Sequence, residues 1–172
     1  MSYREGKQWI RTRVADLAAD GAVSVLDVGP GVGTYAKLFD GLPIAHLVGL
    51  EVWAPYVTTY HLHDFYDELI IGDVREAPLP PVDVVVLGDV VEHMPRADAL
   101  AVWDRCAATA RRAVYLSLPI VHYPQHAIED NPYEVHVEED WSHDTVLETF
   151  AGIGAWERGD EVGVYERLTG TA

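Results

Sequence analysis

The chain has 172 residues, of which 49% are hydrophobic, and a formal net charge of −16 from 28 acidic residues against 12 lysines and arginines. This length and apolar content predict one folded domain over residues 1–172 and exclude a disordered chain. The acidic balance, without a basic stripe, argues against nucleic acid or an anionic membrane as a partner. The apolar runs are strand-sized and the N-terminus lacks a signal-peptide pattern, so we expect a cytoplasmic protein without a membrane span.

Apolar periodicity and turn residues predict helices and strands in alternation. In chain order we expect a helix at 5–19, a strand at 23–28, a helix near 33–40, a strand at 46–51, a helix near 55–64, strands at 68–72 and 83–88, a helix near 97–109, a strand at 113–118, a helix at about 143–151 capped by Ser142, and strands near 153–158 and 162–168. Gly159-Asp160 between the last two strands is typical of a hairpin turn. The alternation indicates a mostly parallel sheet that ends in an antiparallel hairpin.

The most informative segment is the turn after the first strand, Asp27-Val-Gly29-Pro-Gly31-Val-Gly33. Alternate glycines allow a sharp turn and let the backbone approach a ligand closely. A dinucleotide-binding turn usually reads G-x-G-x-x-G, but here the last position is Thr34, which argues against an NAD-dependent oxidoreductase. The chain also lacks the Gly-x-Ser-x-Gly turn typical of α/β hydrolases.

Three later strands also end in an acid, namely Glu51, Asp73 and Asp89. The carboxyl ends of parallel strands meet at one edge of the sheet, where open α/β sheets bind their ligands. Glu51 lies about 20 residues after the glycine loop, where a nucleotide-binding fold needs an acceptor for ribose hydroxyls. The series of acids therefore predicts a ligand site along this edge.

A second cluster follows the fourth strand, in the segment Asp89-Val-Val-Glu92-His93. If residues 89–93 form one helical turn, these three side chains occupy positions i, i+3 and i+4 on one face. Two carboxylates and an imidazole suit Mg²⁺ or Mn²⁺, since soft metals prefer thiolates. His136, in the long segment 119–141, is a candidate fourth ligand. The same segment supplies candidates for the wall of an acceptor site: His122, Tyr123, His126, Tyr133 and Trp141.

An acid followed by Gly-x-Gly-x-Gly, with acids at the ends of the next strands, resembles the class I S-adenosylmethionine (SAM) methyltransferases. The resemblance implies a three-layer, Rossmann-like α/β fold with a mostly parallel seven-stranded sheet and a C-terminal antiparallel hairpin. It implies SAM as the cofactor, with the glycine loop under its methionine end, Glu51 on the ribose diol and Asp73 near the adenine amino group. The implied cofactor-binding residues are Asp27, Gly29, Gly31, Gly33, Glu51, Asp73, Val74 and Asp89.

The second half of the chain is similar to one branch, the small-RNA 3′-terminal ribose 2′-O-methyltransferases. That branch carries E-x-x-E-H after strand four, Ser-x-Pro after strand five and a histidine before a Trp-Thr helix start. The matching segments here are Asp89-x-x-Glu92-His93, Ser117-Leu-Pro119, and His136 ahead of Trp141-Ser142. The resemblance implies a divalent metal held by Asp89, Glu92, His93 and His136. The first acid is one methylene shorter than in the branch, and the His-to-Trp spacing differs.

We therefore expect a SAM-dependent methyltransferase that methylates a hydroxyl of a small molecule, a sugar or another diol. His93 and His136 are the expected catalytic residues, and Mg²⁺ or Mn²⁺ is a candidate second cofactor. We expect no counterpart of that branch's RNA-binding domains, and the charge argues against RNA. Two alternatives stay open: a metal-free N- or O-methyltransferase with His93 as general base, and a non-catalytic SAM-binding partner subunit. A homodimer is a candidate assembly.

Overall fold

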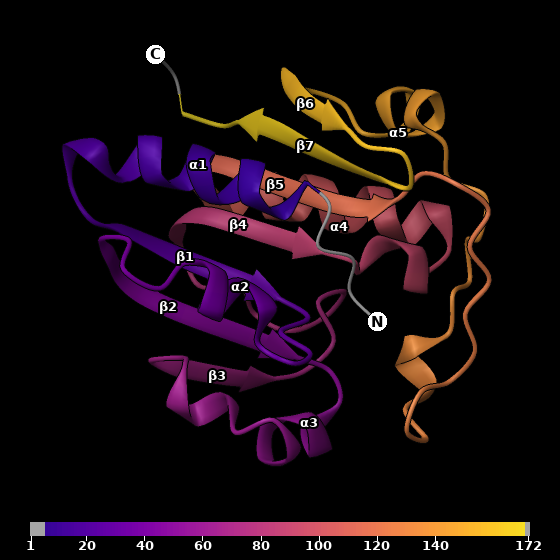
Figure 1. Cartoon of the computed structure of the whole chain (residues 1–172), viewed down its shortest axis with the longest axis horizontal. Coiled ribbons are helices and arrows are strands. Elements are labelled where there is room, and N and C mark those ends of the chain that lie inside the picture. Colours follow the sequence, from indigo (N-terminus) through magenta and orange to yellow (C-terminus); the bar gives the residue numbers. More distant parts are fainter. Residues whose placement is uncertain (1–5, 171–172) are drawn as a thin grey trace.

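The computed structural model describes residues 6–170, which form a seven-stranded sheet between two layers of helices (Figure 1). The strands are β1 (Val23–Val28), β2 (Ile44–Glu51), β3 (Glu68–Ile71), β4 (Val82–Gly88), β5 (Ala110–Pro119), β6 (Ala155–Arg158) and β7 (Val162–Leu168). Their order in the sheet is β3-β2-β1-β4-β5-β7-β6. Strands β1 to β5 pair in parallel, while β7 runs antiparallel to both β5 and β6. The predicted sheet, with its antiparallel C-terminal hairpin, is confirmed.

The helices lie near their predicted positions: α1 (Lys7–Leu17), α2 (Thr34–Leu38), α3 (Ala54–Thr59), α4 (Arg96–Thr109) and α5 (His143–Thr149). Ser142 begins α5 as predicted, because its side-chain oxygen accepts a hydrogen bond from the backbone N–H of Thr145. The single helix expected at 55–64 is broken at His61, whose φ of +53° is left-handed. The short 3₁₀ helix η2 (Leu62–Asp64) follows, and the break turns Leu62 fully into the core.

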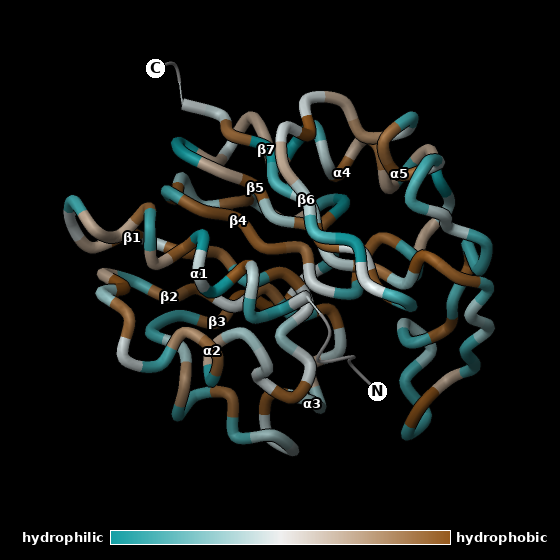
Figure 2. Tube along the Cα trace, turned by 45° about the horizontal axis from the view of Figure 1, so that its top comes forward, coloured by the Kyte–Doolittle hydropathy of each residue, from teal (hydrophilic) through white to brown (hydrophobic). Residues whose placement is uncertain are grey.

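Alternate residues of the central strands face opposite layers of helices. In β4, Val84 and Val86 belong to the core under α1, α2 and α3, whereas Val85 and Leu87 belong to the core under α4 and α5. β4 is therefore apolar on both faces and runs brown through the middle of the molecule (Figure 2). Among residues 6–170, no helix has the length and apolar character needed to cross a membrane.

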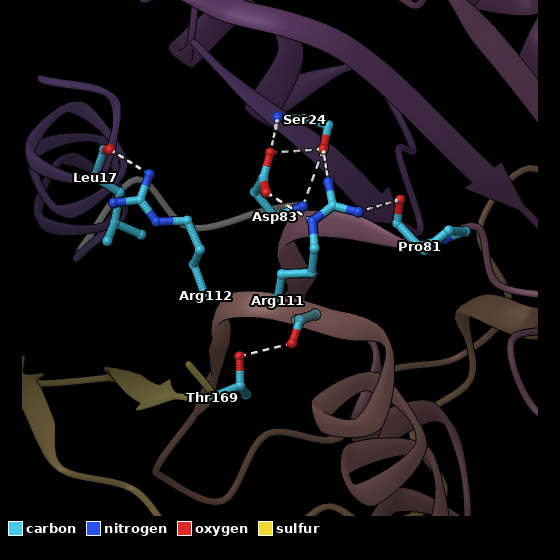
Figure 3. A network of polar contacts seen from close by, with 8 residues as sticks. Leu17, Ser24, Pro81, Asp83, Arg111, Arg112 and Thr169 are labelled. Atoms are coloured by element: carbon cyan, nitrogen blue, oxygen red, sulfur yellow. Dashed lines mark hydrogen bonds and ion pairs between the residues drawn. The ribbon is translucent and has the colours of Figure 1, made fainter. Parts of the chain in front are cut away.

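At the amino ends of the strands, charged side chains tie several elements together (Figure 3). Asp83 of β4 accepts hydrogen bonds from the backbone N–H and the hydroxyl of Ser24 on β1. The same carboxylate pairs with Arg111 of β5, whose Nε lies 2.9 Å from its Oδ1. Arg112 donates to the carbonyl of Leu17 at the end of α1. Ion pairs and hydrogen bonds thus occupy this edge, which leaves the carboxyl edge for a ligand.

The segment 119–141 stands off the carboxyl ends of the strands (Figure 1, orange). Its outward and return limbs lie side by side, because the N–H of Tyr123 donates to the carbonyl of Glu139 at 3.0 Å and that of His136 to the carbonyl of Gln125 at 3.0 Å. One short 3₁₀ helix, η4 (Pro132–Glu134), lies at its far end. The segment therefore faces the edge at which the strands end in acids.

Candidate active site

A cavity of about 180 Å³ lies at the carboxyl edge, between the glycine loop, the end of β4 and the segment 119–141. Gly29 and Gly31 form one wall, with left-handed φ angles of +69° and +52°. A Cβ on Gly29 would lie 2.8 Å from Cγ2 of Val90, so that a side chain there would force Val90 to shift. The loop therefore presents bare backbone to the cavity, which is what close approach to a ligand requires.

A second cavity of about 80 Å³ adjoins the first, and Gly29 and His93 line both. Asp73 and Val74 line this second cavity. Of the other predicted cofactor residues, Asp27 and Glu51 line neither cavity. Gly33 begins α2 with a φ of +76° and lines neither cavity.

The acids that end β1 and β2 are buried next to the glycine loop. Glu51 accepts hydrogen bonds from the backbone N–H of Gly31 at 3.1 Å and of Trp53 at 2.8 Å, and burial raises its pKa. Asp27 accepts a hydrogen bond from the hydroxyl of Tyr66, and burial raises its pKa to about 7. Glu51 therefore fixes the shape of the glycine loop directly.

Asp73 is paired with Arg75, and both residues line the second cavity. Nε of Arg75 lies 2.9 Å from its Oδ1 and 3.0 Å from its Oδ2. These hydrogen bonds lower the pKa of Asp73, so its carboxylate is charged and fixed in orientation.

Asp89 does not share the face that the spacing predicts for it. The helical turn begins only at Val91 (η3, Val91–His93), and Asp89 precedes it with a left-handed φ of +57°. Its backbone N–H is bonded to the carbonyl of Ser117, which keeps it in line with β4. Its carboxylate accepts hydrogen bonds from Nζ of Lys7 at 2.9 Å and from Oγ of Ser117 at 3.1 Å.

Lys7 is a site residue that the sequence analysis missed. Its side chain is buried, with the ammonium 2.9 Å from the Asp89 carboxylate and 4.9 Å from the centre of the Tyr35 ring. Burial works to lower the pKa of Lys7, but Tyr35 and Asp89 outweigh it and the pKa is raised. A lysine near the start of an amphipathic helix has no sequence signal for burial, and only the packing of α1 turns it inward.

Glu92, His93 and His136 do come together, with one ligand atom of each within 4.8 Å of the others. The Nδ1 atom of His93 lies 3.2 Å from the carbonyl oxygen of Val135, and that of His136 lies 2.6 Å from the carbonyl oxygen of Tyr123. Because a carbonyl only accepts, each Nδ1 carries the proton and each Nε2 keeps its lone pair for a ligand. Metal-binding histidines are usually oriented in this way.

Glu92 lacks the partners that a buried carboxylate needs. It is 1% exposed, and among residues 6–170 neither of its oxygens has a hydrogen-bond partner. Burial, followed by the charge of Asp89, raises the pKa of Glu92 well above its usual value. Burial lowers the pKa of both His93 and His136, so the two imidazoles are neutral. One carboxylate and two neutral imidazoles fit a divalent cation, and Asp89 is not a member of this group.

The segment 119–141 supplies part of the cavity walls. Tyr123 lines the first cavity and Tyr133 the second. The prediction of a wall position for Trp141 is wrong, because this ring is buried in the core and stacks on Phe150 with centroids 5.4 Å apart. His122 instead pairs with Asp140 at 2.7 Å, and His126 lines neither cavity.

Comparisons with known proteins agree with this architecture. A family model described as a methyltransferase domain matches residues 26–115, whereas a comparison with curated proteins gives no significant match. The chain is similar to an O-methyltransferase family 2 protein from Planctomyces limnophilus in complex with apigenin, at 14% identity and a TM-score of 0.66, over 92% of this chain and 56% of that chain. It therefore spans little more than half of that relative.

Two further solved structures are similar over most of their own length. One is magnesium protoporphyrin IX methyltransferase from Synechocystis with bound SAM, at 20% identity and a TM-score of 0.64, over 95% of this chain and 79% of that chain. The other is the N-terminal domain of EvdMO1 in the presence of S-adenosylhomocysteine (SAH) and D-fucose, at 15% identity and a TM-score of 0.64, over 95% and 82%.

The mostly parallel seven-stranded sheet with its antiparallel C-terminal pair is that of a Rossmann-like methyltransferase, as predicted. Because the family model spans more than half of the 172 residues, the chain belongs to this methyltransferase-domain family. The resemblance to class I methyltransferases is thereby confirmed. The narrower resemblance to a metal-dependent branch stays a prediction.

Proposed function

We propose that the chain is a SAM-dependent methyltransferase that methylates a hydroxyl of a small molecule, a sugar or another diol, with a divalent cation at Glu92, His93 and His136. The observation that carries this proposal is the buried Glu92 carboxylate, which has no hydrogen-bond partner among residues 6–170 and lies beside two imidazoles on the wall of the glycine-lined cavity. The three candidate metal ligands and the glycine loop line the same cavity. An acceptor hydroxyl bound at the cation would therefore lie next to the methyl donor, SAM.

Three observations support SAM and a sugar as the reactants. The glycine loop and the adjoining Asp73–Val74 cavity offer one continuous edge for a nucleoside with a charged tail. Among the structural neighbours, one holds SAM and another was solved with SAH and the sugar D-fucose. The first cavity is lined by tyrosines and carboxylates but, within the described residues, by no lysine or arginine, which suits a neutral hydroxylated acceptor.

The proposed reaction needs alignment more than activation of the donor, because a methyl group on a sulfonium is already reactive. When bound, a divalent cation lowers the pKa of a coordinated hydroxyl. Glu92, His93 and His136 would hold this cation, and the carbonyls of Val135 and Tyr123 would keep both imidazole rings oriented.

A metal-free mechanism is the second candidate, and the position of His93 favours it. His93 lines both cavities, and burial lowers its pKa, so its imidazole can accept a proton at neutral pH. In this mechanism, activity would be lost as the pH falls through that lowered pKa and the imidazole becomes protonated.

The experiment that tests the function is incubation with radiolabelled SAM, Mg²⁺ or Mn²⁺, and a panel of glycosides, phenols and amines. We expect transfer of the label to a hydroxyl, and calorimetry should show that SAM and SAH bind while NAD binds far more weakly. Tight NAD binding without SAM binding would overturn the proposal that SAM is the methyl donor. Transfer to amines alone would overturn O-methylation.

Replacing Glu51 with alanine should weaken SAM binding. Ribose hydroxyls would lose a charged acceptor, at about 1.5–3 kcal/mol, or roughly 10- to 150-fold in affinity. The glycine loop would also lose the hydrogen bond at the Gly31 N–H. Calorimetry checks the prediction, with Glu68→Ala on the exposed end of β3 as the control. Unchanged affinity would show that Glu51 does not hold the ribose.

No nucleic acid should bind at physiological salt. The net charge of −16 opposes phosphate contacts, which supply most of the affinity of non-specific complexes. Gel shifts with single- and double-stranded RNA and DNA measure this directly. A micromolar dissociation constant would redirect the search for the acceptor toward RNA.

A further inference from the structure

Residues 129–138, which we call the strap, are hydrogen-bonded to the elements on both sides of the glycine loop. On one side it contacts α3, which follows β2: Oη of Tyr56 donates to Oε1 of Glu134 at 3.1 Å. On the other side it contacts η3, which follows β4: Nδ1 of His93 donates to the carbonyl of Val135 at 3.2 Å. Because β1 lies between β2 and β4 in the sheet, the strap passes over the loop at the end of β1.

The strap places Glu134 on the wall of the same cavity as Gly29 and Gly31. Oε1 of Glu134 accepts the hydrogen bond from Tyr56, and Oε2 accepts one from Nε2 of Gln125 at 3.3 Å. Nε2 of Gln125 also donates to the backbone carbonyl of Glu134 at 2.7 Å. A phenol and an amide are neutral donors, so they orient this carboxylate without compensating its charge.

Three carboxylates line this cavity, those of Asp89, Glu92 and Glu134. Asp89 is paired with the ammonium of Lys7 at 2.9 Å, and the charge of Glu92 would be compensated by the cation proposed for its group with His93 and His136. Of these three acids, Glu134 is the one whose negative charge stays available to attract a bound molecule. Glu92, which is buried on the same wall without a hydrogen-bond partner in the described part of the chain, is an independent indication that this cavity receives a ligand.

We propose that Glu134 is a cofactor-specificity residue, whose carboxylate faces the sulfonium of bound SAM and makes the site prefer SAM to SAH. The inference rests on the proposed function. SAM and SAH share adenine, ribose and the amino-acid group, and they differ by one methyl group and the positive charge on sulfur. A fixed negative charge near the sulfur therefore attracts the substrate and ceases to attract the product once the methyl group has left.

Calorimetry of SAM and of SAH with the full chain tests this inference. Glu134→Gln keeps an oxygen for Tyr56 but removes the charge, and we expect an about tenfold loss of SAM affinity with a less than about twofold change for SAH. Glu129→Gln is the matched control on the same strap. Its carboxylate accepts a hydrogen bond from Tyr60 at 3.0 Å but lines neither cavity, so both affinities should stay unchanged.

The ratio of SAM affinity to SAH affinity distinguishes loss of charge recognition from loosening of the strap. A loosened strap would weaken the binding of SAM and of SAH equally. Equal losses in Glu134→Gln, or no loss for either molecule, would overturn the inference and leave the proposed function standing. A wild-type chain that binds neither molecule would overturn the proposed function and the inference with it.

Discussion

Replacing Glu92 with glutamine should lower methyl transfer by about 10²–10⁴-fold while SAM affinity stays within about twofold. The substitution removes the charge from the group formed with His93 and His136 and leaves the glycine loop and the Asp73–Val74 cavity unchanged. Excess chelator should inactivate the wild-type protein to the same extent and add nothing to the variant. Label transfer with and without EDTA, calorimetry with SAM, and the bound metal content measure the three effects.

Glu138→Gln is the matched control for this experiment. Glu138 lies on the strap and pairs with Arg96 at 3.2 Å, outside the metal group, so activity and sensitivity to chelator should be unchanged. Methyl transfer that persists in excess chelator would contradict the proposal that a divalent cation is needed for the reaction. If His93→Ala then abolishes that transfer, His93 is the general base.

Replacing Gly31 with valine should abolish SAM binding, with a loss of more than about 100-fold, and should leave the chain folded. Apart from its chain neighbours, the nearest atom to an added Cβ at this position is the backbone oxygen of Gly29 at 3.9 Å, so the added carbon would take up open space on the cavity wall. The left-handed φ of +52° would cost about 1–2 kcal/mol of folding free energy. Calorimetry measures the affinity, and thermal unfolding measures the cost.

Gly41→Val separates the two effects of that substitution. Gly41 has a similarly left-handed φ of +75°, has no atom within 4 Å of an added Cβ and lines neither cavity. The Gly41→Val variant should therefore lose about as much folding free energy as Gly31→Val and keep the SAM affinity of the wild type. If both variants bind SAM as the wild type does, the glycine loop is not the cofactor site.

Much of the fold could be predicted because it depends on local patterns. β4 is buried on both faces, which leaves the uninterrupted apolar run from Val84 to Leu87 before Gly88. The β6–β7 hairpin follows in the same way from Gly159-Asp160. The break at His61 could not be predicted, because no glycine or proline marks it. It depends on the burial of Leu62 against the sheet.

The candidate site could be predicted where it depends on spacing along the chain. Glu92 and His93 are neighbours on one turn, and the resemblance supplied His136. The pairing of Lys7 with Asp89 joins residues 82 positions apart and could not be read from any local pattern. The same contact explains why Asp89 leaves the predicted face, since its carboxylate is held by Lys7 and Ser117.

The amino and carboxyl ends of the strands differ in how fully their polar side chains are hydrogen-bonded. At the amino ends, Asp83 is bonded to both Ser24 and Arg111. At the carboxyl ends, Oδ1 of Asp27 and both oxygens of Glu92 are buried without a partner among residues 6–170. Hydrogen exchange should therefore be graded along each strand, because local opening needs the least free energy where packing and pairing are poorest. Amides near Asp83 would exchange only when the whole domain unfolds, whereas amides around the glycine loop would exchange through small openings that a bound ligand suppresses.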